Sequence, residues 1–399
     1  MSCYQDILGQ IDKNGIETVH FIFIDPTGIL RCKSVLSKEI KETINISLLD
    51  GVSINGNLIP GYQDKNKWFR AVPDLNSFFV LPKNERLNTR EAAFMCSISN
   101  TTFDSRRVIH EMTTHASHMS LFPMCGMAFS YGMLDNSAKR ENGAYCMLPG
   151  SMLSNFNTLL VRELISCGID IESFMSYGST HNGIELVPQS VAKSIDQIMI
   201  CRWIACSLGI QNSYQISISL PFANACPIHI SIWNDLHSRN LFYSSKGKLE
   251  YSDLAWHFIA GILANFDEIF AVIQATAPNI TLAHLRKTFS ATDTDCVLGT
   301  PEFFIEKDKK ERIGWSKRCV FRGIPIEANL YLVLGCIFMA GLFGIKNRLL
   351  PEEYSNSDYD NYSISTNDKR KKLMGSKLFN NYLGNDVISA LNVWLEEQE

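Results

Sequence analysis

The sequence lacks the features that mark several large classes of protein. Lys and Arg (37) nearly balance Asp and Glu (41), the net charge is −4, and no basic stripe follows the chain. Nucleic acid is therefore not expected as a partner, because binding to phosphates depends on clustered cations. The longest apolar run, residues 330–345, has 16 residues, fewer than the roughly 18 that suggest a membrane span. It predicts a buried core helix and no membrane partner.

Motifs of common enzymes and of secreted proteins are also missing. The 12 cysteines occur singly, without a C-x-x-C pair or paired metal-ligand spacing, and no secretory leader precedes them. This pattern predicts reduced cysteines in a cytoplasmic protein. No P-loop, G-x-S-x-G elbow or G-x-G-x-x-G loop occurs. A reactive cysteine–histidine pair can arise by chance among so many cysteines, but no local pattern singles one out.

The order of the expected elements predicts an α+β fold. Residues 18–24 are β-branched and aromatic, and the turn residues 25–28 follow them, which predicts a hairpin. Farther along, strands alternate with amphipathic or apolar helices, including helices expected at 253–275 and 328–345. We predict one domain over residues 1–100 and a second over 101–399. The second includes a polar surface segment at 352–372.

Six short segments carry a family resemblance, and they follow one another in a fixed order. They are DPTGILR at 25–31, LDGVSI at 49–54, VPDL at 72–75, IHISIW at 228–233, ATAP at 275–278, and the parts of 321–345 that read FR, EAN, YL and AGLFGI. Together they resemble the glutamine synthetase family over nearly the whole chain. The resemblance implies an N-terminal β-grasp domain and a catalytic domain built on a twisted antiparallel sheet with helices. It also implies subunits stacked in rings.

The chemistry that the resemblance implies depends on metal ions. The family forms γ-glutamyl phosphate from ATP and glutamate, and ammonia then displaces the phosphate. Divalent cations on carboxylate ligands must neutralise the polyphosphate during such a transfer. At the positions that match the family's metal ligands, this chain instead has Met127, Phe129, Ser176, Gly183, Pro227 and Val320. These residues offer no carboxylate, so the sequence predicts no Mg²⁺ or Mn²⁺ site and no cofactor.

Three residues of the family's pocket survive, and each has two interpretations. Asp50 matches an aspartate that reaches into a neighbouring subunit's ammonia site, or it is a turn residue before Gly51. His229 matches a nucleotide-binding histidine, or it is a hydrogen-bonded core histidine. Arg322 is either a remnant of an anion-binding pocket or half of an ion pair with Glu327.

Several functional hypotheses follow from this resemblance. The first is a catalytically inactive scaffold, partner or regulatory subunit, assembled as a homo-oligomeric ring or together with a paralogue. The alternative is an ATP-dependent glutamate–amine (γ-glutamyl) ligase with a repurposed pocket, which requires ATP and Mg²⁺ or Mn²⁺. A further possibility is a sensor in which Arg322 holds a carboxylate. The sequence leaves enzymatic activity open and favours its absence.

Overall fold

The structure is a computed structural model. It describes residues 2–42, 50–59, 68–84, 86–99, 104–134, 152–177, 181–218, 227–234, 238–277, 285–301, 316–351 and 366–396. The chain divides into two compact units. Unit 1 comprises Met1–Ser105, Phe129–Leu186 and Asp196–Ser219, and unit 2 comprises Arg106–Ala128, Val187–Ile195 and Leu220–Glu399. Unit 1 therefore combines the first part of the chain with two later stretches.

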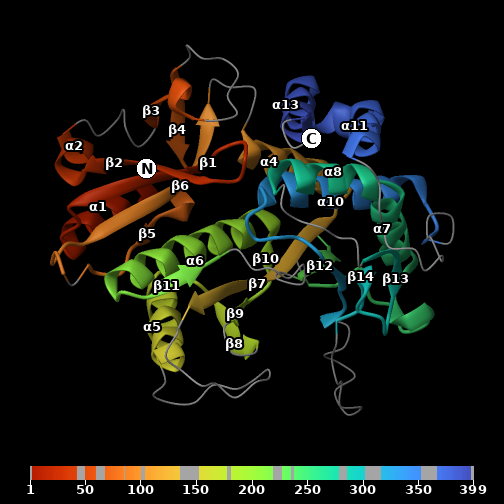
Figure 1. The fold of residues 1–399 in the computed structure, drawn as a ribbon, viewed down its shortest axis with the longest axis horizontal. Helices are drawn as coiled ribbons and strands as arrows, with labels where there is room; N and C mark the ends of the chain where they lie inside the picture. Colours follow the sequence, from red (N-terminus) through yellow and green to blue (C-terminus); the bar gives the residue numbers. More distant parts are fainter. Residues whose placement is uncertain are drawn as a thin grey trace. The chain divides into compact units, whose positions relative to one another are not determined.

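Unit 1 contains a six-stranded sheet formed by the first hundred residues (Figure 1). Its strands follow the order β2-β1-β6-β4-β3, with β5 paired to β6. β1 and β6 are parallel, and the other pairs are antiparallel. The strands are β1 (Thr18–Ile24), β2 (Leu30–Leu36), β3 (Val52–Asn55), β4 (Trp68–Pro73), β5 (Phe79–Val80) and β6 (Glu91–Ser99); the helices with them are α1 (Ser2–Asn14) and α2 (Ser37–Glu42).

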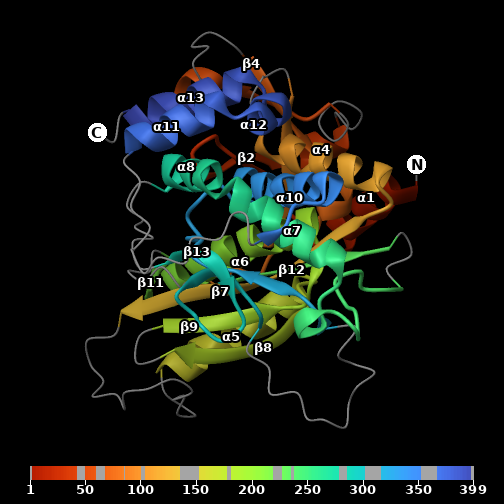
Figure 2. The ribbon, with the colours of Figure 1, turned by 90° about the vertical axis from the view of Figure 1, so that its right-hand side faces the viewer.

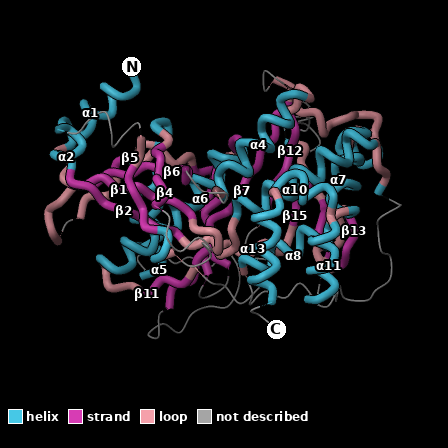
Figure 3. The backbone as a smooth tube through the Cα atoms, turned by 90° about the horizontal axis from the view of Figure 1, so that it is seen from above, coloured by secondary structure: helices cyan, strands magenta, loops and turns pink. Residues whose placement is uncertain are grey.

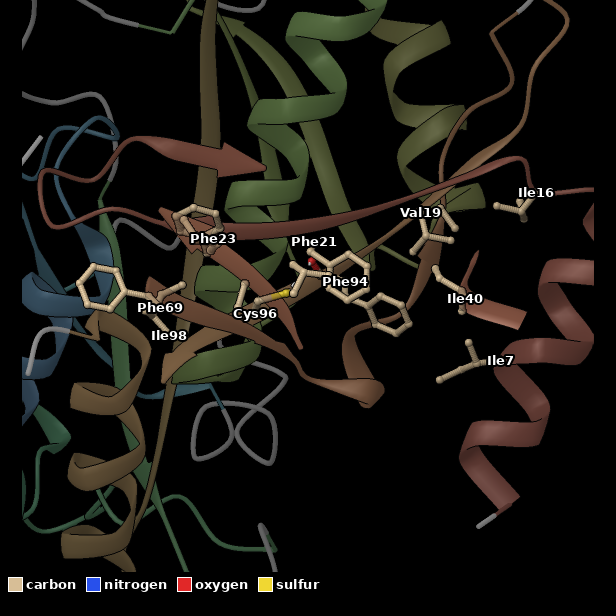
Figure 4. Packing of buried hydrophobic residues seen from close by; sticks show 14 of the residues in the cluster. Ile7, Ile16, Val19, Phe21, Phe23, Ile40, Phe69, Phe94, Cys96 and Ile98 are labelled. Carbon is tan, nitrogen blue, oxygen red and sulfur yellow. Dashed lines mark hydrogen bonds between the residues drawn. The ribbon is translucent and has the colours of Figure 1, made fainter. Parts of the chain in front are cut away.

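One face of this sheet forms a hydrophobic core with the two helices. Phe21 of β1 and Phe94 of β6 lie at its centre, with ring centroids 5.9 Å apart (Figure 4). Ile7 of α1 and Ile40 of α2 join the same cluster. The alternation of side chains along a strand leaves the other face of β1 to His20 and its neighbours.

The predicted hairpin is confirmed, and Asp25 holds its turn. Strands β1 and β2 pair antiparallel from Thr18 with Leu36 to Ile24 with Leu30. The Asp25 carboxylate accepts hydrogen bonds from the backbone N–H of Thr27 at 3.0 Å and of Ile29 at 2.9 Å. Its other oxygen accepts from Nε of Arg31 at 2.9 Å. An aspartate followed by turn residues thus closes the hairpin through its own side chain.

A second sheet has nine strands in the order β13-β14-β15-β12-β7-β9-β8, and β10 and β11 also pair with β7. Among the pairs of described residues, β13 and β14 are parallel and the others antiparallel. The long strand β7 belongs to both units. The strands are β7 (Phe122–Leu134), β8 (Ile171–Tyr177), β9 (His181–Leu186), β10 (Gln189–Ser190), β11 (Gln215–Ser217), β12 (Ile228–Trp233), β13 (Arg286–Ser290), β14 (Cys296–Gly299) and β15 (Cys319–Phe321).

The helices of the later chain include the predicted core helix. They are α4 (Ser105–His118), α5 (Met152–Ser166), α6 (Val191–Gln211), α7 (Asp253–Ala264), α8 (Phe266–Thr276), α10 (Leu330–Asn347), α11 (Thr366–Gly375), α12 (Lys377–Leu383) and α13 (Asn385–Glu396). In unit 2, α11 and α13 lie beside α8 (Figure 3). Of the polar segment predicted at 352–372, residues 352–365 lie outside the described residues, and 366–372 begin α11.

Helix α10 has the length and hydropathy of a membrane span, but 78% of it is buried inside the fold, as in a core helix. Taken together as one bent span, helices α7 and α8 also have the length and hydropathy of a membrane span. The side chain of Asn329 caps α10 by accepting from the backbone N–H of Leu332 at 3.3 Å. Burial and capping together confirm the predicted core helix.

The single helix expected at 253–275 is wrong, because α7 and α8 meet at an angle of 61°. Asn265 lies at the junction, where its backbone leaves helical geometry. Its side-chain Nδ2 donates to the carbonyl oxygen of Gly261 at 2.8 Å. Asparagine offers the backbone such alternative partners and is therefore common where helices end.

Helices α7 and α10 of unit 2 approach each other at two glycines (Figure 2). A Cβ atom added to Gly344 would lie 2.1 Å from the carbonyl oxygen of His257 and 2.6 Å from Cα of Gly261. The obstructing atoms belong to the backbone, which cannot move aside as a flexible side chain can. The contact between the two helices therefore requires glycine at this position.

We expect Gly344→Ala to lower the free energy of unfolding by about 1–3 kcal/mol, because the added methyl overpacks the α7–α10 contact. Urea unfolding measures the change. Gly9→Ala in α1 is the matched control, since no atom lies within 4 Å of its added Cβ. That variant should gain about 0.5–1 kcal/mol from helix propensity. A G344A protein as stable as the parent would contradict the close contact.

Candidate functional site

Four neighbouring strands of unit 2 place four residues in one row across the second sheet. His229 of β12 pairs with Gly126 of β7 on one side and with Val320 of β15 on the other. Val320 pairs in turn with Gly299 of β14. Residues directly opposite one another on neighbouring strands share a face of the sheet. We call Gly126, His229, Val320 and Gly299 the cross-strand row.

Two arginines flank the row. Arg318 and Arg322 lie two residues before and after Val320, just outside β15, and the positive charges of both act on the imidazole of His229. The guanidinium of Arg322 occupies the space above Gly299, because a Cβ atom there would lie 2.4 Å from Nη1. Nη1 of Arg322 also donates to the carbonyl oxygen of Cys296 at 3.2 Å. The small size of Gly299 thus admits the arginine into the row.

These surroundings keep His229 uncharged. Burial, and with it the positive charges of Arg318 and Arg322, lowers the pKa of its imidazole to about 3. Nδ1 of His229 is buried, and within the described part of the chain it has no hydrogen-bond partner. The sequence allowed His229 to be a hydrogen-bonded core histidine. Among the described residues, Nδ1 has no hydrogen bond that supports this interpretation.

The register separates Met127 and Phe129 from the row. Met127 pairs with Ile228, so it lies on the opposite face from His229, and Phe129 follows it at period two. Both side chains are core residues, 2% and 0% exposed. On the face of His229, β7 presents Ala128 after Gly126. Neither face of this stretch carries a carboxylate.

The remaining predicted positions lie as follows. Val320 is 3% exposed at the centre of the row, and Pro227, just before β12, is half-buried. On the β8–β9 hairpin of unit 1, position 176 pairs with Asn182, whereas Gly183 pairs with Met175. Positions 176 and 183 therefore belong to opposite faces of the hairpin. This register does not bring the two positions together as ligands of one ion.

A series of buried polar side chains in unit 1, connected by hydrogen bonds, was not predicted from the sequence. The hydroxyl of Tyr131 donates to Oδ1 of Asn157, and Nδ2 of Asn157 donates to Oδ1 of Asn182 at 3.2 Å. All three residues are buried, and burial raises the pKa of the Tyr131 hydroxyl. They come from β7, α5 and β9, so their spacing along the sequence does not indicate these hydrogen bonds. The members of the series are neutral and are not the carboxylates that divalent cations prefer.

Asp50 occupies an exposed bend before β3. Nε of Arg70 donates to its backbone carbonyl at 2.6 Å, and Nη2 of Arg70 donates to the carbonyl of Gly51 at 2.8 Å. Gly51 has φ +78°, and a Cβ there would lie 2.1 Å from the carbonyl oxygen of Ala71. This geometry supports the interpretation of Asp50 and Gly51 as turn residues.

The residues of the row do not fit a divalent cation. Gly126, Val320 and Gly299 have no donor side chains, and the flanking arginines repel a metal ion. Among the described residues, no group of three or more His, Cys, Asp and Glu side chains is arranged to hold a metal. The arrangement is instead cationic, and guanidinium groups favour anions.

Comparison with known proteins assigns the family. Residues 76–380 match the sequence model described as "Glutamine synthetase, catalytic domain". The chain belongs to the glutamine synthetase family.

Individual relatives are distant but cover nearly the whole chain. A glutamine synthetase of Clostridium saccharobutylicum is 22% identical, over 95% of this chain and 93% of that protein. A glutamate–isopropylamine ligase of a Pseudomonas species is 21% identical, over 86% of this chain and 81% of that protein. The solved structure titled "GmaS/ADP complex-Conformation 1" has a TM-score of 0.80 at 16% identity, covering 98% of this chain and 95% of that one. At this identity the structural likeness shows the fold.

The lowered pKa of His229 predicts a loss of stability in acid. In the unfolded chain the imidazole takes up a proton near its ordinary pKa of about 6.5, whereas in the fold it does so near pH 3. Between these values the unfolded state binds more protons, so stability falls as the pH falls. His229→Gln removes this effect. Between about pH 7 and about pH 5, the free energy of unfolding should therefore fall by about 1–2 kcal/mol less in H229Q than in the parent.

Urea unfolding at the two pH values measures the difference. The control is His118→Gln, because His118 is exposed on α4 and lies outside the row. This control should show the same loss in acid as the parent. Equal losses in H229Q and the parent would rule out a neutral His229 with a lowered pKa.

Proposed function

We propose that this chain is a catalytically inactive member of the glutamine synthetase family that acts through protein contacts, as a scaffold, partner or regulatory subunit. The observation that carries the proposal is the position of Val320 between Arg318 and Arg322, beside the neutral His229. The family's chemistry places divalent cations on carboxylates in its pocket. Here the corresponding strand offers a valine and two fixed positive charges.

The electrostatics of the row support the loss of activity. Two like charges about 4 Å apart repel by about 4 kcal/mol at an effective dielectric constant near 20. Among the described residues, the row offers no carboxylate ligand to a divalent ion brought close to Arg318 and Arg322. Without the ion, the polyphosphate of ATP lacks the charge neutralisation that phosphoryl transfer requires. The arginines keep a general affinity for anions, but anion binding alone does not activate a phosphate.

The loss of the acidic ligands also agrees with a stable scaffold. Clustered carboxylates repel one another when no metal is bound, and their replacement by apolar or small residues removes that cost. Val320 is nearly fully buried in the row. The sheet is thus packed at a position where the family resemblance implies a metal-binding carboxylate.

The proposal includes an N-terminal β-grasp domain, assembly into rings and a cytoplasmic location. The parallel pair of β1 and β6, with α1 and α2 on the core face, supports an N-terminal β-grasp domain. We propose ring assembly as a homo-oligomer or together with a paralogue, because the family resemblance extends over the N-terminal segments as well. No cofactor is expected, and the proposed location is the cytoplasm.

A second candidate is an ATP-dependent glutamate–amine ligase with a repurposed pocket. The likeness to a glutamate–isopropylamine ligase favours it, since that relative's name describes the ligation of glutamate to an amine larger than ammonia. Such a ligase needs ATP and Mg²⁺ or Mn²⁺, and the cross-strand row does not fit those ions. The inactive scaffold is therefore the better supported proposal.

An activity assay distinguishes the two proposals. The purified chain, incubated with ATP, glutamate, Mg²⁺ or Mn²⁺, and either ammonium or isopropylamine, should release no phosphate above the protein-free background. An active glutamine synthetase assayed in parallel shows that the conditions support turnover. Isothermal titration with ATP and metal should likewise give no metal-dependent heat. Phosphate release that requires both glutamate and amine would establish the ligase instead.

Assembly has its own test. Mass photometry of the purified chain should show a species of at least several subunits of 45.0 kDa each, because the proposed scaffold keeps the family's intersubunit surfaces. A mixture with an active paralogue from the same cell should show whether the two form common particles. A chain that stays monomeric under both conditions contradicts the proposed ring.

A further inference from the structure

Four polar side chains gather on the face of the N-terminal sheet opposite its hydrophobic core. Nδ1 of His20 lies 2.8 Å from Oγ of Ser34 and 3.8 Å from Sγ of Cys32. Nε2 of His20 lies 3.0 Å from a carboxylate oxygen of Glu91. Sγ of Cys32 and Oγ of Ser34 are 3.6 Å apart. The thiol contacts the imidazole, and the imidazole contacts the carboxylate. This is the arrangement of a nucleophile, a base and a group that orients the base.

The register explains why these residues meet. Ser34 pairs directly with His20, and Cys32 lies two residues before Ser34 on β2, so the three share one face. Glu91 of β6 pairs with Thr18, which lies two residues before His20 on β1. No spacing along the chain indicates this arrangement, because three different strands contribute to it.

The surroundings hold the imidazole in place while leaving the thiol accessible. The ring of Trp203 packs edge-on against that of His20, with centroids 5.2 Å apart and an interplanar angle of 81°. The side chain of His20 is only 12% exposed. Cys32, by contrast, is exposed on β2, the last strand of the sheet. A small molecule can therefore reach the sulfur beside an oriented base.

The electrostatics of the cluster favour a thiolate–imidazolium pair. Burial alone would raise the pKa of the Cys32 thiol, but its hydrogen bonds with His20 and Ser34 outweigh this and lower it. Burial likewise opposes the charged form of His20, but the interactions with Cys32 and Glu91 prevail and raise its pKa. Both changes promote proton transfer from sulfur to nitrogen.

The other described cysteines have the opposite character. Cys96, Cys125, Cys201, Cys296, Cys319 and Cys336 are buried. Cys167 and Cys206 are half-buried, and burial raises the pKa of Cys167 to about 12 and also raises that of Cys206. Within the described chain, Cys32 thus combines exposure with a basic neighbour in a way that the other cysteines do not.

We propose that Cys32 is a modification site that undergoes thiol–disulfide exchange with disulfides of low molecular weight, with His20 as its base and Glu91 as the residue that positions His20. The proton on Sγ moves to Nδ1 of His20, and the thiolate attacks one sulfur of the disulfide. A bond forms between Sγ and that sulfur as the original S–S bond breaks. The released thiolate takes the proton from His20. Cys32 is oxidised to a mixed disulfide, and the other half of the reagent is reduced to a thiol.

The test uses the full chain and oxidised glutathione as the probe. The reduced protein is incubated at about pH 7, quenched with acid at intervals, and mapped by mass spectrometry, which ranks all 12 cysteines, including Cys3, Cys146 and Cys226. We expect Cys32 to react at least about fivefold faster than any other cysteine, since the thiolate is the attacking species. A faster reaction at another position would overturn the proposal.

Variants test the roles of the partners. His20→Gln should slow the exchange at Cys32 by about five- to tenfold, and Glu91→Gln by about two- to threefold. Cys206→Ser, which removes a half-buried thiol, should leave the rate at Cys32 unchanged. Glu91→Gln is nearly isosteric and keeps the test informative if His20→Gln unfolds the sheet, which thermal unfolding detects. Rates at Cys32 unchanged in both H20Q and E91Q would refute the assigned roles.

A pH profile separates activation of the thiol from simple exposure. The titratable groups that act on the thiol are His20 and Glu91. Alkylation of Cys32 by iodoacetamide should persist at lower pH in the parent than in H20Q, because the imidazolium stabilises the thiolate. If the two profiles coincide, Cys32 is merely exposed, and the proposal fails. None of these measurements depends on whether the family's activity is absent.

Discussion

The pairing of β12 with β15 is the constraint on which the rest of the site depends. It sets His229 beside Val320, which two arginines flank in sequence. The half-buried imidazole then stays uncharged at neutral pH, and the described residues of the row offer no carboxylate to attract a cation. A site that is electropositive by construction is the opposite of the acidic pocket expected for this family's metal ions.

Glycines allow close contacts both in this sheet and between two helices of unit 2. Gly299 makes room for the guanidinium of Arg322, and Gly261 and Gly344 let α7 and α10 approach until their backbones touch. In each case a side chain of any size would force atoms apart. Small residues therefore determine the packing at these places as much as the large apolar ones do, because close-packed interiors do not tolerate even one additional methyl group without strain.

The N-terminal sheet shows a different use of strand pairing. One face buries Phe21 and Phe94, and the other collects Cys32, His20 and Glu91. This second face also buries Ile22 and Met95, and Trp203 packs there against His20, but Cys32 on the edge strand β2 stays exposed. The thiol cluster belongs to unit 1 and the cross-strand row to unit 2.

The sequence by itself determined the family, the order of elements, the Asp25 turn, and the absence of carboxylates near the expected ligand positions. These are local patterns or residue identities, and they do not depend on distant contacts. Only the tertiary structure decided which face of β7 accompanies His229, where the helix over 253–275 bends, and that Cys32 meets His20. The phase of a strand and the meeting of residues from separate strands are set by pairing across long stretches of chain, and a one-residue shift in that pairing exchanges the two faces.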